Sequence, residues 1–334
     1  MDRYEHLKSI FDRRECFKLV CGAGNENCDE VRKLAFVYTI AGAAILDLSA
    51  RTDIIDAAQK GVEQAYKAAG SLGRHIAFRP YLNVSIGIKG DPHVRKALID
   101  RSVCTACGKC IEVCEQRAIG GDYAVRGSLC IGCGRCVTVC PAKAVGFTHT
   151  RIDPAAVLPQ CLRLGVETLE LHAVTLDEKG VFDDWKTLNA LGTGNYISMC
   201  LDRSLLSDSE LVNRVRKAYL ATGERFIVQA DGFPMSGEKD DFNCTLQAVA
   251  CADIVQKSGI PVKILLSGGT NSKTGALAKQ CGVAAHGVAV GSFARKIVRD
   301  FIMHQDFDGN IPLIEKAVSA AENLVKSNIE AIRG

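Results

Sequence analysis

Eight of the sixteen cysteines in this chain fall into two runs that have the same spacing, C-x2-C-x2-C-x3-C. In bacterial ferredoxins this spacing binds cubane iron–sulfur clusters, and the fourth cysteine of each run ligates the other cluster. The sequence therefore predicts two [4Fe–4S] clusters. The first would be held by Cys104, Cys107, Cys110 and Cys140, and the second by Cys130, Cys133, Cys136 and Cys114.

Zinc sites or a disulfide framework could also account for cysteine-rich runs. Zinc sites commonly use paired C-x2-C knuckles, and disulfide frameworks are typical of small secreted domains. Neither pattern places four thiols in each run, so the two-cluster interpretation is favoured. Glu115 follows the first run where Pro141 follows the second. We expect this departure to affect packing around Cys114 and to leave the number of ligands intact.

Composition limits the classes of partner and compartment. The 334 residues are 47% hydrophobic with a net charge of +3 and no long basic run, so nucleic acid is not an expected partner. Free cysteines in this number indicate a reducing compartment, and the charged first 19 residues do not resemble a signal peptide. The longest uncharged apolar stretch, Leu34 to Leu46, is too short to span a bilayer. We expect a cytoplasmic protein that does not span the membrane.

Outside the cysteine runs, short apolar segments alternate with helical patterns, which predicts eight strands that are each followed by a helix. This order fits an α/β fold of the (β/α)8 TIM-barrel type, with an open doubly wound sheet as the alternative. Eight units and glycine-rich loops after the last two strands favour the closed barrel. The predicted strands are 17–22, 44–48, 81–88, 166–172, 196–202, 225–231, 262–267 and 287–291.

The cysteine segment interrupts the connection between the third strand and its helix. Residues 1–90 and 151–305 would form the barrel, residues 91–150 an inserted two-cluster ferredoxin-like α+β module, and residues 306–334 a C-terminal helix. Lys96–Ile99 and Val145–Thr148 are candidate flanking strands of the module, although Lys96–Ile99 could also be helical. Because such connections lie at the carboxyl ends of barrel strands, we expect the clusters near the barrel mouth.

Glycine-rich loops after the last two predicted strands indicate a phosphate-type site. The backbone donors would come from Gly268, Gly269, Gly291 and Ser292, and side-chain contacts from Thr270, Lys273 and Arg295. The alternative is that these glycines only form tight turns between strand and helix. The occupant is left open between FMN, another phosphate-bearing ligand or substrate, and no ligand.

Polar residues at other strand ends are candidates for catalysis at the same mouth. The candidates are His172, Asp202 and Asp231, with His172 the preferred general acid or base because imidazole titrates near neutrality. Successive residues of a barrel strand point alternately in and out, so not all polar strand-end residues can line the site. For each candidate, a purely structural role in a salt bridge or a helix cap is equally compatible with the sequence.

Several long strings resemble the light-dependent period (LdpA) family of cyanobacteria. They are Gln229–Gly237, Ser198–Ser204, Ser267–Gly275 and His286–Arg295, together with the double cysteine run, and the resemblance covers about Phe17 to Arg295. It implies a redox-active iron–sulfur protein that adjusts the circadian period to light, senses redox state through quinones and associates with clock-input proteins. The eight cluster cysteines carry over to this chain, whereas no barrel residue carries over as a catalytic group.

The sequence leaves two functional hypotheses and one structural alternative open. In the first, the chain is a redox sensor whose clusters exchange electrons with a soluble electron carrier or a quinone. In the second, it is an oxidoreductase, with or without a flavin, that acts on a small or quinone-like electron acceptor at the barrel mouth. In the third, the clusters only stabilise the fold. Whether the chain is an enzyme is left open.

Overall fold

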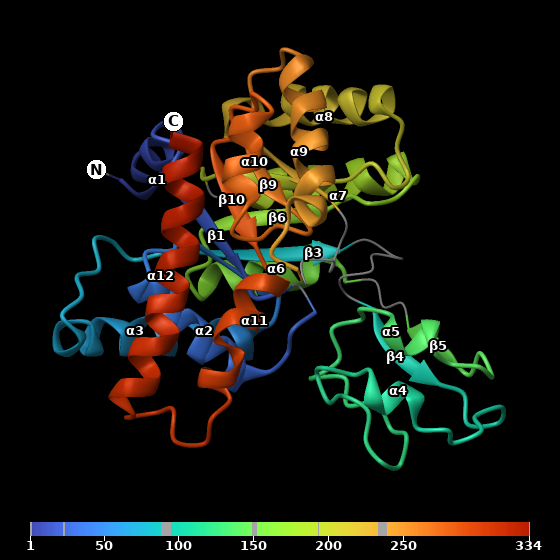
Figure 1. Ribbon diagram of the computed structural model, residues 1–334. Helices are drawn as coiled ribbons and strands as arrows, with labels where there is room; N and C mark the ends of the chain where they lie inside the picture. The colour runs from blue at the N-terminus through green and yellow to red at the C-terminus, as the bar shows by residue number, and fades with distance from the viewer. Residues whose placement is uncertain are drawn as a thin grey trace.

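Eight parallel strands close into a barrel in the computed structural model, which describes residues 2–22, 24–87, 95–148, 152–192, 194–232 and 239–333 (Figure 1). The strand order is β1-β10-β9-β8-β7-β6-β3-β2. This closed order confirms the predicted barrel and rules out the open sheet. The strands are β1 (Cys16–Val20), β2 (Ile45–Ser49), β3 (Tyr81–Gly87), β6 (Thr168–His172), β7 (Ile197–Leu201), β8 (Phe226–Asp231), β9 (Lys263–Ser267) and β10 (Gly287–Val290).

Helices cover the outside of the barrel, and most of them carry one apolar face. In α3, for example, Ile54, Ala58 and Ala65 are buried at helical spacing while the opposite face is charged. The covering helices are α2 (Cys28–Ile40), α3 (Thr52–Ala68), α6 (Pro154–Arg163), α7 (Glu178–Leu191), α8 (Asp208–Thr222), α9 (Phe242–Lys257), α10 (Thr274–Gln280), α11 (Ser292–Ile302) and α12 (Ile311–Arg333). Two short 3-10 turns, Gly70–Leu72 and Gly223–Arg225, precede β3 and β8.

A helix that the sequence patterns did not reveal closes the amino-terminal end of the barrel. In α1 (Arg3–Asp12), Leu7, Ile10 and Phe11 are buried against an apolar layer that includes Tyr81 and Leu265. The dense charge of this segment hides its short apolar stripe. The bottom of the barrel is therefore sealed, and its open end is the one where the strands terminate.

The cysteine-rich insertion leaves the barrel after β3 and returns before α6. Its two strands, β4 (Lys96–Ile99) and β5 (Val145–Thr148), pair antiparallel, and its helical turns are α4 (Lys109–Glu112) and α5 (Arg135–Thr138). Lys96–Ile99 is thus a strand and not a helix. The insertion forms a separate small lobe beside the carboxyl ends of the barrel strands (Figure 1).

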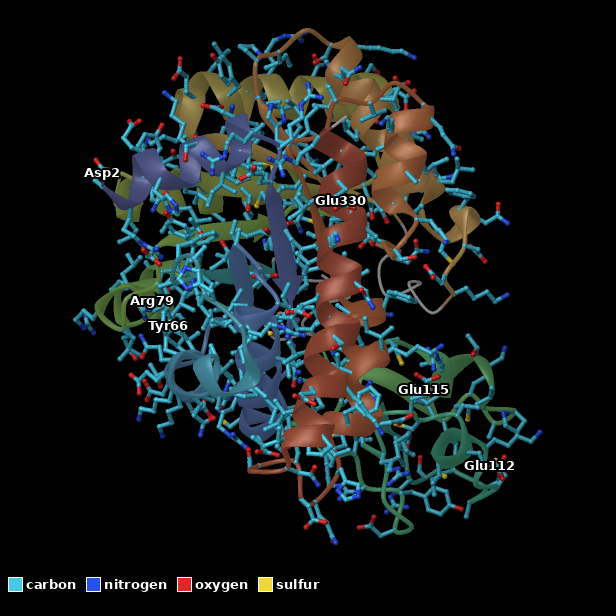
Figure 2. All side chains as sticks on the ribbon, turned by 60° about the vertical axis from the view of Figure 1, so that its left-hand side comes forward. Asp2, Tyr66, Arg79, Glu112, Glu115 and Glu330 are labelled. Atoms are coloured by element: carbon cyan, nitrogen blue, oxygen red, sulfur yellow. The ribbon has the colours of Figure 1, made fainter. Side chains whose placement is uncertain are left out.

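Two sets of contacts hold this lobe against the barrel. Lys96 Nζ donates to the carbonyl oxygens of Gly24 at 2.6 Å and Cys130 at 2.8 Å, and it lies 3.2 Å from Glu26 Oε1. On the other side, the Arg299 guanidinium in α11 donates to the Glu115 carbonyl at 2.9 Å. Figure 2 shows Glu115 on the side of the lobe that faces the C-terminal helices. The second cysteine run is therefore anchored to the loop after β1.

We expect stability to fall in acid through His286, which precedes β10. Its Nδ1 accepts the Ile264 amide at 3.1 Å, and burial, then Lys263 and Arg14, lower its pKa to about 4. Between pH 4 and the ordinary value near 6.5, the unfolded chain binds a proton that the folded chain does not. The stabilisation is present above that window and is lost as pH falls through it, by about 3 kcal/mol.

Urea unfolding at pH 7 and pH 4.5 measures this loss. The matched variant is His286→Asn, whose side-chain oxygen can accept the same amide without binding a proton. We expect a smaller loss of unfolding free energy on acidification in the variant than in the parent protein. Equal losses in the two proteins would contradict the role assigned to His286.

Candidate functional site

The eight cysteines of the two runs gather around two separate cavities. One cavity is lined by Cys104, Cys107, Cys110 and Cys140, and the other by Cys114, Cys130, Cys133 and Cys136. Each cavity thus receives three thiols from one run and the fourth from the other run. These are the two sets that the ferredoxin spacing predicts for two clusters.

Backbone amides point at the sulfur atoms in a repeated arrangement. The amide of Ala118 donates to Cys114 Sγ and that of Ala144 to Cys140 Sγ, each at 3.3 Å, so the last cysteine of each run has the same partner four residues on. The Ala97 amide of β4 donates to Cys130 Sγ at 3.3 Å. Hydrogen bonds from backbone amides to sulfur stabilise the thiolate form of cysteine, and they tune the reduction potential of a bound cluster.

The thiols in each cavity also lie close enough to repel one another as thiolates. Burial, followed by the neighbouring thiols of Cys133, Cys130 and Cys114, raises the pKa of Cys136 to about 11. Burial likewise raises the pKa of Cys110, with smaller contributions from Cys104, Cys107 and Cys140. A positively charged metal centre removes this repulsion, since it binds thiolates and releases their protons.

The cavities fit a cluster better than a single ion. Within the described ranges, no three His, Cys, Asp or Glu side chains converge closely enough to hold one metal ion. A zinc ion would need its sulfur ligands at about 2.3 Å, which brings the thiols close together. A cubane is larger and lets the four sulfurs stand around a cavity. The residues present therefore fit two [4Fe–4S] clusters.

Glu115, which stands where the second run has Pro141, has a structural role. Its carboxylate pairs with Arg135 Nη1 at 2.5 Å, and its carbonyl accepts from Arg299 of α11. The first run therefore ends in a contact with helix α11 of the barrel. Cys114 still lines the cavity of the second cysteine set.

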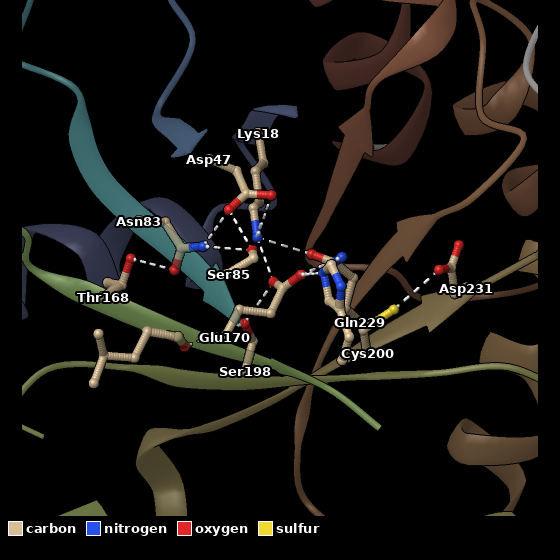
Figure 3. Close-up of polar contacts among 12 residues, drawn as sticks. Lys18, Asp47, Asn83, Ser85, Thr168, Glu170, Ser198, Cys200, Gln229 and Asp231 are labelled. Atoms are coloured by element: carbon tan, nitrogen blue, oxygen red, sulfur yellow. Dashed lines mark hydrogen bonds and ion pairs between the residues drawn. The ribbon is translucent and has the colours of Figure 1, made fainter. Parts of the chain in front are cut away.

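A network of buried polar side chains, separate from the cysteine sites, fills the middle of the barrel (Figure 3). Lys18 of β1 donates to Glu170 of β6 and, at 3.0 Å, to Gln229 Oε1 of β8, and it lies 3.9 Å from Asp47 Oδ2 of β2. Gln229 Nε2 donates to Glu170 Oε1 at 2.8 Å. Ser198 Oγ donates to the same carboxylate at 2.7 Å. TIM barrels normally fill this layer with apolar side chains, so the charged layer departs from the usual barrel core.

The charges of this layer stabilise one another. Burial by itself would lower the pKa of Lys18, but Asp47 and Glu170 raise it above its ordinary value. Burial by itself would raise the pKa of Glu170, but Lys18 and His172 hold it below its usual range. For Asp47, burial prevails over Lys18 and raises the pKa. Lys18 and Glu170 therefore form a buried ion pair, with Asp47 as a second, weaker partner.

Above the charged layer lies a small cavity that opens at the barrel mouth, with a volume of about 80 Å³. It is lined by side chains or backbone from several strands and from the insertion. Among its walls are His172, Cys200, Gln229, Asp231, Arg295 and, from the second cysteine run, Ile131. Ile131 also lines the cavity of the second cysteine set. The mouth and the second predicted cluster are therefore neighbours that share one side chain.

The three catalytic candidates have different positions. His172 and Asp231 line the mouth cavity; His172 Nε2 lies 3.2 Å from Glu170 Oε1, and Asp231 Oδ2 accepts from Cys200 Sγ at 2.9 Å. Burial, and next Asp231, raise the pKa of Cys200, so the thiol stays protonated. Asp202 does not line the cavity that the described residues form. It accepts the amide and hydroxyl of Ser204 and so shapes the turn after β7.

Most of the predicted anion-binding residues converge at the mouth. Gly268, Gly269, Thr270, Gly291, Ser292 and Arg295 all line the cavity. Gly268 has a positive φ of 66°, and a Cβ there would lie 1.5 Å from Asp231 Oδ1, so glycine is required at this position. Thr270 Oγ1 donates to the Ala289 carbonyl at 2.6 Å. Lys273 precedes α10 and is not among the residues that line this cavity in the described chain.

The cavity fits a small anion and not a flavin. Its volume of about 80 Å³ is below the several hundred Å³ of pockets that enclose drug-sized ligands. Arg295 supplies a positive charge there, and the Nε and Nη1 atoms of its guanidinium are buried without a hydrogen-bond partner among the described residues. Asp47 and Asp231 add acidic groups to the same walls. The described part of this cavity therefore has the size of a phosphate group and not of a whole FMN molecule.

Lys18 and Ile131 were not anticipated as site residues. The signal for Lys18 is a single charge in the centre of an otherwise apolar strand, at the same parity as Val20, which lines the mouth. The position of Ile131 depends on how the insertion docks, and the sequence carries no signal for that.

Known proteins match both the cysteine segment and the barrel of this chain. The model of the 4Fe-4S binding domain matches residues 97–120 and 123–145, and that of the light dependent period A C-terminal domain matches residues 161–327. The curated protein light dependent period A of Synechococcus elongatus is 30% identical over 364 aligned positions, which cover 95% of this chain and 92% of that protein. The likeness thus extends past Arg295 into α12.

One of two similar solved structures supports the fold, and the fold alone. The YdjI aldolase of Escherichia coli K12 superposes with a TM-score of 0.50 at 8% identity and covers 97% of this chain and 94% of its own. Tryptophan synthase from M. tuberculosis gives a TM-score of 0.45 at 12% identity, and the match covers 96% of this chain and 98% of that chain.

Within the described ranges, no helix is both long and apolar enough to cross a membrane. From the two domain matches and the full-length relative, the chain belongs to the light dependent period A family.

Proposed function

We propose that this chain is a redox-responsive iron–sulfur protein that adjusts circadian period, and that it binds two [4Fe–4S] clusters. The observation that carries this proposal is the sorting of eight cysteines into two separate cavities, each with the crossed set of four. When bound, the clusters supply one-electron redox chemistry. The family name and the matched 4Fe-4S domain support the link between iron–sulfur chemistry and the light-dependent period.

The two cluster sites would have different tasks. Cys107 of the first site is exposed, so this site can exchange electrons with a soluble electron carrier or a quinone. The second site borders Ile131 and the groove between the insertion and α11. A change in the charge of this site would therefore change the electrostatic potential at the barrel. Clock-input proteins would then bind a surface that differs between the oxidised and reduced forms.

Hydrogen exchange on anaerobically purified protein tests the sensor role. We expect reduction to change the protection of amides in α11 and in the insertion, because the second cluster gains a negative charge next to Arg295 and Arg299. Helix α8, on the far part of the barrel, is the internal reference. Identical exchange of all three regions in both redox states would contradict a sensor that works through this interface.

A second candidate function is reduction of a small electron acceptor at the barrel mouth. The charged layer around Lys18 and the shared Ile131 favour it, since a purely structural barrel has no need of either. His172 would hold or supply a proton, and the loops at Gly268 and Gly291 would position an anionic group. A Gly269→Asp variant is expected to lose turnover with anionic acceptors; full turnover would contradict a working site at the mouth.

A further inference from the structure

A larger groove lies between the insertion and α11, outside the barrel mouth. Its volume is about 570 Å³, within the range of about 300–1,000 Å³ that encloses small-molecule ligands. Two of the second set of cysteines, Cys114 and Cys133, form part of its wall. We call it the insertion groove, and its lining is Ile111, Glu112, Cys114–Arg117, Ile131, Cys133, Arg135, Ser292, Arg295, Lys296, Arg299 and Asp300.

Cationic side chains line both walls of the insertion groove. Arg295, Lys296 and Arg299 come from α11, and Arg117 and Arg135 come from the insertion. The lining contains five cationic residues against three acidic ones, Glu112, Glu115 and Asp300. One pair of opposite charges, Glu115 with Arg135, is neutralised within the groove. The remaining lining contains four cationic and two acidic residues, an excess of positive charge.

The first turn of α11 adds to the attraction for an anion. Ser292 and Arg295 line both the groove and the barrel mouth, and no described side chain caps the start of this 11-residue helix. The amides of the first turn and the positive helix end favour a negative group beside them. Two nitrogens of the Arg295 guanidinium are buried without partners among the described residues, so this cation keeps unused hydrogen-bonding capacity next to the groove.

We propose that the insertion groove binds a small molecule that carries two or more phosphate groups. Because both walls carry positive charges, we expect a polyanion that contacts both walls to bind more tightly than a single phosphate. The proposal deepens the proposed redox function, because such a ligand lies against two thiolates of the second cluster. Reduction adds a negative charge there, so the reduced protein binds the polyanion less tightly. By reciprocity, the bound polyanion lowers the reduction potential of that cluster.

Calorimetric titration of the oxidised holoprotein with pyrophosphate tests the site. We expect a dissociation constant at least about tenfold lower for pyrophosphate than for inorganic phosphate, because pyrophosphate brings more negative charge to the cations of the two walls. A double variant, Arg117→Gln with Lys296→Gln, is expected to weaken pyrophosphate binding at least about tenfold. Lys279→Gln, an exposed cation at the end of α10, makes the same kind of charge change away from the groove and should leave binding unchanged.

Electrochemical titration tests the coupling. Tenfold weaker binding to the reduced protein corresponds to a potential lowered by about 59 mV at saturating pyrophosphate. Absence of pyrophosphate binding, or equal binding by the double variant, would overturn the site. Equal binding in both redox states would overturn the coupling alone. Clusters that could not be reduced would argue against the sensor role, while the titration of the oxidised protein would still decide the groove.

Discussion

A Cys133→Ser variant, purified without oxygen, is expected to contain about four iron atoms per chain where the parent contains about eight. Cys133 belongs to the second cysteine set, and loss of one thiolate leaves that cluster with three ligands. The first set shares no cysteine with it, so the first cluster should remain. Iron and sulfide assays together with paramagnetic resonance of the reduced protein measure the outcome.

The same variant should lose redox-dependent binding of its partner proteins, because the second cluster is the one next to the barrel. Cys281→Ser is the matched control, since Cys281 is exposed and lies in neither cysteine set. It should keep all of its iron. Retention of all iron by Cys133→Ser would contradict the ligand assignment, and redox-responsive binding by an iron-depleted Cys133→Ser protein would contradict the sensor role.

A Lys18→Met variant is expected to lose about 3–5 kcal/mol of unfolding free energy. Lys18 is 1% exposed and is the cation that balances Glu170 and Asp47 in the middle of the barrel. Its removal leaves carboxylates buried without that partner, which costs more than the ion pair itself contributes. Urea unfolding can be followed through Trp185, the single tryptophan of the chain, which packs on Phe226 of β8.

Lys60→Met serves as the control for this measurement. Lys60 lies on the exposed face of α3, so its replacement should change the unfolding free energy by no more than about 0.5 kcal/mol. A second comparison adds Glu170→Met to Lys18→Met. We expect the double variant to be less destabilised than the sum of the single variants, because both charges of the pair are gone. A loss below about 1 kcal/mol in Lys18→Met would contradict a buried ion pair.

Local patterns were sufficient to predict the barrel because short apolar runs mark the strands and helical spacing of apolar residues marks most of the covering helices. The cysteine spacing likewise predicted both sets of four thiols, because the crossing of the fourth cysteine follows from the repeat itself; their role as cluster ligands stays a prediction. Helix α1 was missed because its stripe of Leu7, Ile10 and Phe11 is short and surrounded by charge. The barrel was predicted and α1 was missed for the same reason, the strength or weakness of the local sequence pattern.

The charged layer and the insertion groove could not be predicted in the same way. Lys18, Glu170 and Gln229 meet only when the barrel closes, and 152 and 211 positions separate Lys18 from the other two. Glu115 and Arg299, which join the insertion to α11, are 184 positions apart. Contacts of this range depend on strand register and on docking of the insertion, and neither leaves a periodic signal in the sequence.

The barrel mouth and the insertion groove meet at Ile131, Ser292 and Arg295. An electron on the second cluster, a proton held near His172 and an anion beside Arg295 would therefore influence one another electrostatically. Under the proposed redox function, such coupling would link the charged barrel interior to the iron–sulfur module. It would also place the proposed redox signal next to α11, where Lys296 and Asp300 are exposed to a partner protein.

The most direct test of the two-cluster assignment is a combined iron, sulfide and potentiometric measurement on anaerobically purified parent protein. We expect about eight iron and eight sulfide atoms per chain and two one-electron reductions with cubane-type resonance signals. About four iron atoms, or metal that binds without any reducible signal, would contradict the assignment of two [4Fe–4S] clusters to these eight cysteines.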